Sequence, residues 1–136
     1  MSKKFVVASD FSPLAQKALT LAFELAAAQA AQIYLVHVVE TIESPDTADE
    51  ETRNFHQELL EKASAKLRAL ASSDHIQWTA RLGHRAQEIL NYIEEIKPDL
   101  VFMGLNLQEE GRTRVGVSLQ VLCRCNFPTV MVPPGP

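Results

Sequence analysis

Short apolar, β-branched runs alternate along this chain with segments that repeat apolar residues at helical spacing. The first run, KFVVA at residues 4–8, ends in Ser-Asp and is typical of a buried strand. Ser12-Pro13 follows, a hydroxyl N-cap with proline at the first helical position, and it predicts the start of a helix. Strict alternation of strands and helices predicts a parallel sheet with helices on both faces and right-handed crossovers.

The predicted strands share this apolar character and occupy residues 4–8, 32–39, 76–82, 99–103 and 129–132. The predicted helices lie between them, at residues 13–26, 55–70, 86–96 and 115–123. The third strand, IQWTARL, alternates apolar and polar side chains, which indicates a half-exposed edge strand. Residues 41–52 and 105–114 are polar and have no apolar period, so we expect loops there. The fold class is therefore α/β, with a five-stranded open parallel sheet.

Length and charge narrow the class of protein further. With 136 residues, the chain is long enough for a single domain, residues 1–136, with its own core. The net charge is −4, and Lys and Arg are scattered, so we expect neither a nucleic acid nor an acidic membrane surface as partner. Since no stretch reaches the roughly 18 apolar residues of a membrane span and the N-terminus lacks a signal peptide pattern, we expect a cytoplasmic protein.

The sequence contains no recognisable metal site. Cys123 and Cys125 are separated by one residue, and no further Cys or His stands at zinc-ligand spacing from them. We expect both to be reduced thiols without a metal. For His37 and His84 we expect one hydrogen bond each to the main chain rather than a ligand role.

Open α/β sheets bind ligands beyond the carboxyl ends of their strands, so the residues there are the candidates for a site. They are Asp10, residues 38–40, Gly83 and Gly104. Asp10 precedes a helix, where a carboxylate accepts hydrogen bonds either from main-chain N–H groups or from a ligand; local sequence favours the capping role. Gly104 permits close approach of a ligand, but glycine also suits an ordinary turn at that position.

Motifs for catalysis are missing from the sequence. There is no GxSxG elbow, no Cys with a nearby His, and no carboxylate pair with a nucleophile. Asp10 and Glu40 can both reach the strand ends, but two acidic groups alone define no reaction. We therefore expect no enzyme activity beyond slow nucleotide hydrolysis.

Four stretches in order resemble the universal stress protein (UspA-like) family over essentially the full chain: FVVASDFSPLAQKAL, YLVHVVE, GHRAQEILNYIEEIKPDLVFMG and PTVMV. The resemblance implies a Rossmann-like fold, similar to adenine nucleotide alpha hydrolases, with strand order 3-2-1-4-5. Asp10 and Gly104 would then face one cleft. It also implies a homodimer, commonly formed through the last strand and its surroundings.

Members of this family divide into those that bind ATP and those that do not. The resemblance implies that Asp10, by its side chain, and Val38, by its main chain, contact the nucleoside. Gly104, Gly116 and Ser118 would form the phosphate cradle. The ATP-binding pattern is G-x-x-G, nine residues, then G-S/T, and this sequence departs from it: Leu107 replaces the second glycine, Gly116 comes one residue early and Ser118 one residue late.

The sequence leaves two functions open. In the first, the chain is a homodimeric stress-response module that acts through protein contacts, with unknown partners and with impaired or absent ATP binding. In the alternative, it is a sensor that binds ATP or AMP, with Mg²⁺, in the cleft between the first and fourth strands. Arg112 and Arg114 offer phosphate charge for the second reading, and Glu109 and Glu110 oppose it.

Overall fold

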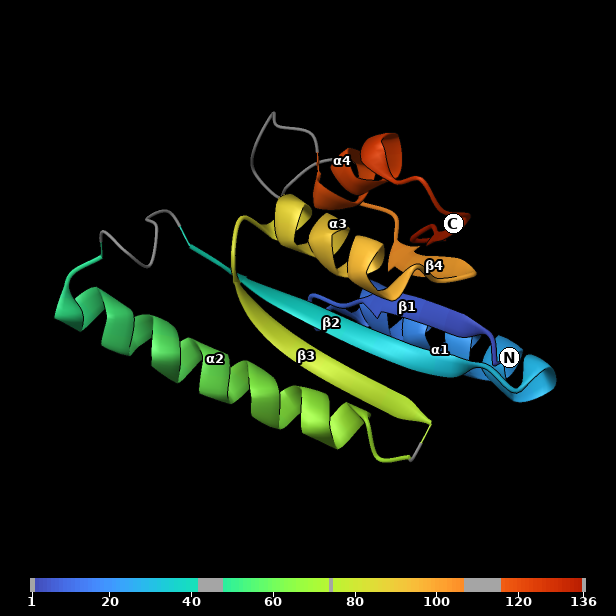
Figure 1. Cartoon of the computed structure of the whole chain (residues 1–136), viewed down its shortest axis with the longest axis horizontal. Coiled ribbons are helices and arrows are strands. Elements are labelled where there is room, and N and C mark those ends of the chain that lie inside the picture. Colours follow the sequence, from blue (N-terminus) through green and yellow to red (C-terminus); the bar gives the residue numbers. More distant parts are fainter. Residues whose placement is uncertain (1, 42–47, 74, 107–115, 136) are drawn as a thin grey trace.

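A computed structural model of the chain describes residues 2–41, 48–73, 75–106 and 116–135. Strands and helices alternate in the order β1 (Lys4–Ala8), α1 (Pro13–Gln29), β2 (Gln32–Glu40), α2 (Glu50–Leu70), β3 (Ile76–Gly83), α3 (Arg85–Ile96), β4 (Leu100–Gly104), α4 (Val117–Arg124) and β5 (Thr129–Val132). The strands form one parallel sheet with the order β3-β2-β1-β4-β5 (Figure 1). The predicted α/β class and the strand order implied by the resemblance are confirmed.

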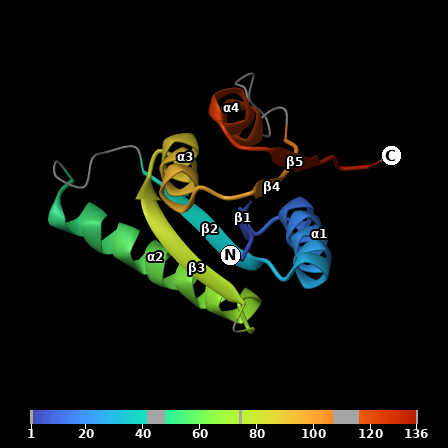
Figure 2. The ribbon, with the colours of Figure 1, turned by 45° about the vertical axis from the view of Figure 1, so that its right-hand side comes forward.

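The helices cover both faces of the sheet because the central strands are apolar on both sides (Figure 2). Phe5 and Val7 of β1 face the layer of α1 and α2, and Phe5 packs against Phe102 of β4 with ring centroids 5.3 Å apart. Val6 and Ala8 point the other way, into the layer of α3 and α4. This alternation follows from the two-residue period of a strand, and it places the core above and below β1.

Local sequence signals fix where the helices begin and end. Ser12 caps α1 by accepting a hydrogen bond from the N–H of Ala15 at 3.1 Å. Helices α1 and α3 end at Ala30 and Lys97, both in the left-handed conformation, with φ of 54° and 52°. Pro98 follows directly and prevents α3 from continuing.

One boundary prediction was wrong. The expected loop at 41–52 gives way to helix at Glu50, where the carboxylate of Asp49 caps α2 by accepting the Thr52 N–H at 2.7 Å. Glu50 and Glu51 add negative charge to the first turn, which favours a helix even without an apolar period. The remaining part of that loop, residues 42–47, lies outside the described residues, as do residues 107–114 of the other predicted loop.

The bounds of β1 and β5 are as predicted, and the other boundaries differ by at most three residues. Helix α1 runs on to Gln29, and strands β2 and β3 each continue one residue further than predicted. Strand β4 is Leu100–Gly104 instead of 99–103, and α4 begins at Val117 because Gly116 is its N-cap. Strand β3 lies at the sheet edge with mostly half-buried side chains, as its alternating sequence predicted. None of the helices in the described part of the chain has the length and apolarity needed to cross a membrane.

Candidate functional site

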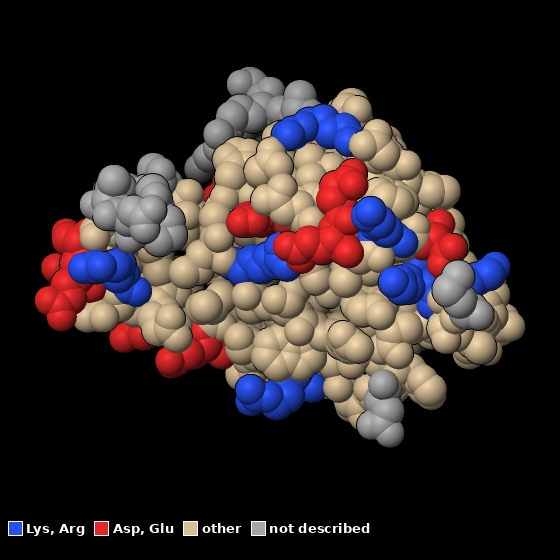
Figure 3. Space-filling view, in the orientation of Figure 1, with Lys and Arg blue, Asp and Glu red and all other residues tan. Residues whose placement is uncertain are grey.

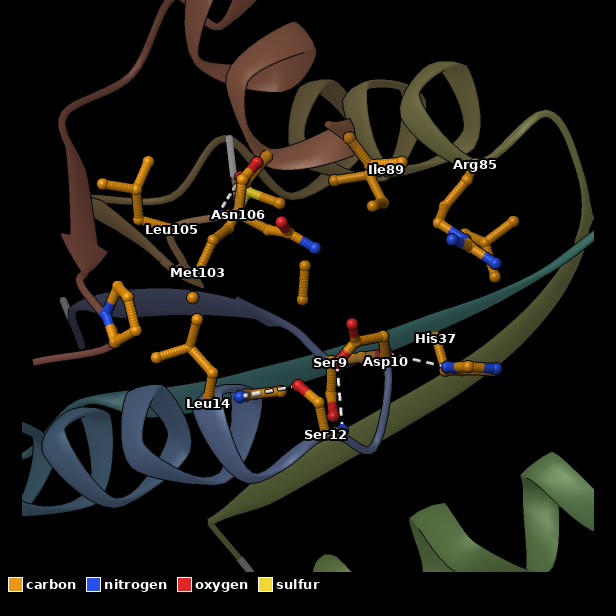
Figure 4. Close-up of a pocket in the computed structure, with 17 residues that line it drawn as sticks. Ser9, Asp10, Ser12, Leu14, His37, Arg85, Ile89, Met103, Leu105 and Asn106 are labelled. Carbon is orange, nitrogen blue, oxygen red and sulfur yellow. Dashed lines mark hydrogen bonds between the residues drawn. The ribbon is translucent and has the colours of Figure 1, made fainter. Parts of the chain in front are cut away.

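A cavity of about 360 Å³ opens at the carboxyl ends of β1 and β4. The chain leaves β1 toward β2 and β3 on one side and returns to β4 and β5 on the other, so these two strands flank the point where the strand order reverses. Asp10, Val38, Gly104 and Ser118 line this cavity. Figure 4 shows the cavity, with Asp10 labelled at the end of β1. The structure therefore brings together four of the five site residues that the sequence indicated, and Gly116 stands beside them as the N-cap of α4.

The loop after β1 presents the carboxylate of Asp10 to the cavity. Oδ1 of Asp10 accepts a hydrogen bond from the N–H of Ser12 at 3.0 Å, while Ser12, and not Asp10, caps α1. Among the described residues no group donates a hydrogen bond to Oδ2, and Asp10 is exposed. The predicted N-cap at Ser12 is confirmed, and Asp10 accepts a main-chain N–H with one of its two oxygens, as the local sequence favoured. One carboxylate oxygen is left to accept a hydrogen bond from a ligand.

Phe11 and His37 form a stacked pair that closes one side of this loop. Phe11 has a left-handed φ of 65°, which is uncommon for an aromatic residue. Its N–H donates to Oγ of Ser9 at 3.1 Å, and its ring stacks on His37 with centroids 4.2 Å apart. Nζ of Lys66 lies 5.1 Å from the centre of the Phe11 ring, within cation–π range. These contacts hold the strained turn, and so the position of the Asp10 carboxylate.

The imidazole of His37 is half-buried and bonded to the main chain. Its Nδ1–H donates a hydrogen bond to the carbonyl oxygen of Ser9, with 2.7 Å between Nδ1 and that oxygen. Burial lowers the pKa of His37 below its ordinary value of 6.5, the Ser9 hydrogen bond opposes this, and the charge of Arg85 lowers it further. The main-chain hydrogen bond expected for His37 is confirmed. His84 is the N-cap residue of α3, and its side chain caps no N–H there.

The main chain of Val38 faces the cavity, because β1 ends before it reaches the level of Val38 in the sheet. The last bond from this end of β1 to β2 is that of the Ser9 N–H to the carbonyl of Val36, at 2.9 Å. Since main-chain groups of alternate residues point to the same side of a strand, the N–H and C=O of Val38 point in the same direction as those of Val36. They offer one donor and one acceptor toward the cavity, which is the pairing that the edge of a base requires.

Gly104 forms part of the cavity wall because Leu14 of α1 approaches it closely. A Cβ placed on Gly104 would lie 2.7 Å from Cγ of Leu14 and 3.3 Å from its main-chain carbon. Any side chain here would therefore displace the first turn of α1 or the Leu14 side chain. Glycine at this position is explained by close packing of a helix against a strand end.

The hydroxyl of Ser118, in the first turn of α4, is already engaged by the protein. It donates to the carbonyl of Asn106 at 2.8 Å and accepts from the N–H of the same residue at 2.7 Å. Ser118 is buried, with 4% of its surface exposed. These two bonds tie the chain after β4 to α4, so the hydroxyl is not free to hold a phosphate. Leu107, whose replacement of a glycine put the cradle in question, lies outside the described residues, together with Arg112 and Arg114.

Arg85 is a cavity residue that we did not anticipate. It is the first residue of α3, two positions after Gly83 at the carboxyl end of β3, so the rule that selected Gly83 could also have selected it. Its Nε is buried without a hydrogen-bond partner, and a terminal nitrogen lies 3.7 Å from Oε2 of Glu40, too far for a hydrogen bond. The guanidinium lies at the end of the cavity near His37, ion-paired with Glu40 (Figure 4).

Metal-ligating side chains are scattered over the rest of the described chain. The described residues contain no group of three or more His, Cys, Asp or Glu that could hold a metal ion. Cys123 and Cys125 are free thiols, and Cys125 packs against the core. Lys and Arg on the face shown in Figure 3 are interspersed with Asp and Glu, without the continuous basic surface of a nucleic-acid binder.

Comparison with known proteins places this geometry in context. The model of the universal stress protein family matches residues 1–133. Hypothetical protein MJ0577 has a similar structure, with a TM-score of 0.85, 22% identity, and coverage of 100% of this chain and 99% of the other. No curated protein matches the chain.

Two further similar structures carry a nucleotide. A universal stress protein in complex with cAMP has a TM-score of 0.66 and 21% identity, covering 96% of both chains. The universal stress protein from Archaeoglobus fulgidus in complex with dAMP has a TM-score of 0.60 and 19% identity, covering 97% of this chain and 98% of the other. At these identities the likeness establishes the shared fold.

Proposed function

Because the chain belongs to the universal stress protein family, we propose that it is a stress-response module whose cleft binds a purine nucleoside monophosphate and whose output is contact with other proteins. The observation that carries this proposal is the contrast between the two ends of one cavity. The nucleoside end, at Asp10 and Val38, offers free hydrogen-bonding groups, whereas the hydroxyl of Ser118 at the phosphate end is bonded to Asn106.

The nucleoside end fits a base and a ribose. The Val38 main chain supplies a donor and an acceptor side by side, and the second oxygen of Asp10 can accept a hydrogen bond from a ribose hydroxyl. Apolar side chains of Ile89 and Met103 line the same cavity and suit the faces of a flat ring. A volume of about 360 Å³ lies at the small end of the range for ligand pockets, roughly 300–1,000 Å³.

The phosphate end disfavours a triphosphate. To reach a phosphate, Ser118 must give up both bonds to Asn106, and unmaking such bonds costs about 1–3 kcal/mol, roughly one to two factors of ten in affinity. A single phosphate needs fewer donors, and those at the N-terminus of α4 remain. The relatives with cAMP and dAMP also carry one phosphate. We therefore expect ATP with Mg²⁺ to bind more weakly than AMP. The proposal thus combines impaired ATP binding, from the first function left open by the sequence, with AMP binding, from the second.

The test is isothermal titration of the purified protein with AMP, cAMP and ATP with Mg²⁺. We expect micromolar binding of AMP, weaker binding of ATP, and loss of AMP binding in Asp10→Ala. Asp49→Ala is the matched control, because Asp49 also accepts a main-chain N–H but lies outside the cavity. No binding of any nucleotide up to millimolar concentration would refute the proposal and leave protein contact as the sole function. Asp10→Ala binding as tightly as the wild type would refute the role of the carboxylate.

We also propose that the role is binding and not catalysis. Three serine hydroxyls line the cavity: that of Ser9 accepts the Phe11 N–H, that of Ser12 accepts the Ala15 N–H, and that of Ser118 bonds to Asn106 in both directions. His37 uses Nδ1 on the main chain of Ser9 and stacks on Phe11, so no described serine stands as a nucleophile with His37 as its base. Chromatography of AMP and ATP after prolonged incubation with the protein should show them unchanged or only slowly hydrolysed; rapid product formation would overturn this part.

The edge strand β5 supports a homodimer. Thr129–Val132 is at the end of the sheet, pairs on one side only, with β4, and keeps all four side chains half-exposed. An unpaired apolar edge is a template for pairing with a second chain. Pro134, just beyond β5, lines the cavity, so a dimer at this edge would border the ligand. Sedimentation at micromolar concentration should give twice the monomer mass of 15.1 kDa, and a single species of 15.1 kDa would refute the dimer.

A further inference from the structure

We propose that His37 is a positioning residue for the Asp10 carboxylate, and that a proton taken up by its ring withdraws this carboxylate from a nucleotide in the cleft. Nucleotide affinity then falls as the pH falls. The inference rests on the proposed function, because it concerns a ligand held by Asp10 in the same cavity. It starts from the two contacts that His37 makes with the turn after β1, which carries Asp10.

His37 holds that turn at the residues directly before and after Asp10. Its Nδ1–H donates to the carbonyl oxygen of Ser9 at 2.7 Å, and its ring stacks on Phe11 with centroids 4.2 Å apart. Figure 4 shows His37 reaching from β2 to Ser9. Phe11 has a φ of 65°, and such a backbone conformation persists only where the surrounding contacts hold it. The position of the Asp10 carboxylate therefore depends on the imidazole of His37.

Charged groups from several elements act on this imidazole. Burial opposes a positive charge on it, and so do Arg85 of α3 and Lys66 of α2, whereas its main-chain hydrogen bond and Asp10 favour the charge. Nζ of Lys66 lies 5.1 Å from the centre of the aromatic ring on which His37 stacks. Glu40, at the exposed end of β2, is ion-paired with Arg85. The balance lowers the pKa of His37 below its ordinary value of 6.5, so His37 takes up its proton at a lower pH than an ordinary histidine.

A proton on His37 changes the forces on Asp10. Because Nδ1 already carries a proton, the second one comes from solvent to Nε2, and the ring becomes an imidazolium. The imidazolium attracts the Asp10 carboxylate and repels Lys66, which lies over the Phe11 ring. Oδ2 of Asp10 accepts no hydrogen bond from a described residue, so this oxygen is free to turn toward the imidazolium. It is also the oxygen proposed to receive a ribose hydroxyl, and the imidazolium and the ligand therefore compete for it.

This competition couples nucleotide affinity to the uptake of one proton. If the protonated form binds no nucleotide, the affinity falls by up to about tenfold for each pH unit below the pKa of His37. Because this pKa is below 6.5, the loss is negligible at pH 7.5 and at most about tenfold at pH 5.5. The coupling is reciprocal, so a bound nucleotide lowers the pKa of His37 further.

The experiment is titration of the wild type, His37→Asn and His75→Asn with AMP at pH 7.5, 6.5 and 5.5. An asparagine amide can donate to the Ser9 carbonyl as Nδ1 does, but it does not titrate. Between pH 7.5 and 5.5 we expect the wild type to lose about 2- to 10-fold more affinity than His37→Asn. The phosphate of AMP titrates in this range too, and the comparison removes its contribution because both proteins meet the same ligand.

His75→Asn is the matched control for the loss of a histidine. His75 is exposed and directly precedes β3, at the amino end of the sheet and outside the cavity, so this variant should follow the wild type. At pH 7.5, His37→Asn should retain more affinity for AMP than His37→Ala, because only the asparagine keeps a donor for Ser9. Circular dichroism at each pH establishes that every variant is folded before affinities are compared.

Proton NMR of the His37 ring provides a second readout that needs no variant. The pKa of His37 in the wild type should be lower with saturating AMP than without it. An unchanged or raised pKa in the complex would overturn the inference, and so would equal pH dependence of AMP affinity in the wild type and His37→Asn. In both cases AMP binding at pH 7.5 would still support the proposed function. Failure of AMP to bind the wild type at pH 7.5 would overturn the proposed function and this inference with it.

Discussion

Gly104→Ala is predicted to destabilise the protein through a single contact with Leu14. The added Cβ would lie 2.7 Å from Cγ, 3.2 Å from Cδ2 and 3.3 Å from the main-chain carbon of Leu14. Carbon atoms prefer about 3.5–4.0 Å, so the shortest contact is too close by about 1 Å. The side chain of Leu14 can rotate into the cavity, but its main-chain carbon moves only with the first turn of α1.

Overpacking of this size costs about 1–3 kcal/mol of unfolding free energy. For a domain of this length that corresponds to a fall in Tm of about 3–5 °C per kcal/mol. Urea unfolding measures the free energy directly, provided the m-value is unchanged. Because the displaced side chain enters the cavity, affinity for AMP should fall as well.

A double-mutant cycle identifies the cause. Leu14→Ala removes the atoms nearest the new Cβ, so the double variant Gly104→Ala with Leu14→Ala should be less destabilised than the sum of the two single variants, by about 0.5–2 kcal/mol. Additivity within about 0.3–0.5 kcal/mol would refute the reasoning, because the two residues would then not interact. An unchanged stability in Gly104→Ala would refute it more simply.

Three further predictions concern groups near the cavity and in the core. Ser118→Ala should lower the unfolding free energy by about 1–2 kcal/mol in urea, because both bonds to Asn106 are lost, whereas Ser73→Ala, in an exposed turn, should change it by less than about 0.5 kcal/mol. The pKa of His37 is lowered in the folded state, so the unfolded chain takes up the proton first as the pH falls toward and below 6.5. The free energy of unfolding of the wild type should therefore decrease between pH 7.5 and 5.5. In His37→Gln this decrease should be smaller. Burial raises the pKa of Tyr92 to about 12, although the charge of Arg81 opposes this, so the unfolded chain loses the phenol proton first as the pH rises. The free energy of unfolding of the wild type should therefore decrease from about pH 10 to 12. In Tyr92→Phe this decrease should be less steep.

Each of these has an outcome that contradicts it. If Ser118→Ala is as stable as the wild type, water replaces the hydroxyl as the hydrogen-bond partner of the Asn106 main chain. An acid loss in His37→Gln as large as that of the wild type would show that burial of the imidazole does not contribute to the pH dependence. If the free energy of unfolding falls equally steeply above pH 10 in Tyr92→Phe and in the wild type, a group other than Tyr92 causes the loss.

The sequence predicted the elements and the outline of the site from local chemistry. Both faces of the sheet are covered, so no polar residue interrupts the buried apolar runs of β1 and β4. These uninterrupted runs are what allowed the two strands to be predicted from the sequence. Asp10 and Gly104 follow those strands directly, and the carboxyl ends of neighbouring parallel strands meet at one edge. The start of α2 escaped prediction, because its first turn is held by Asp49 and by its acidic residues instead of by apolar contacts.

Contacts between residues that are far apart along the chain could not be predicted from the sequence. Leu14 and Gly104 are far apart along the chain, and only the packing of α1 on β4 shows that they touch. The engagement of Ser118 by Asn106 depends on where α4 lies relative to the end of β4, which no spacing rule specifies. Arg85 was missed for the same reason, since an arginine at the start of a helix reads as a solvent-exposed charge until the fold places it in a cavity.

Amino-acid order alone determined the α/β class, because strand and helix periods and caps are properties of neighbouring residues. It also determined the family, through four matching stretches in order, as the match over residues 1–133 confirms. Tertiary structure decided which polar groups at the strand ends are free. Asp10 retains an open oxygen, whereas the hydroxyl of Ser118 is bonded to Asn106. Hydrogen-bonding capacity is used up by partners that are remote in sequence, so only their positions in space show what remains for a ligand.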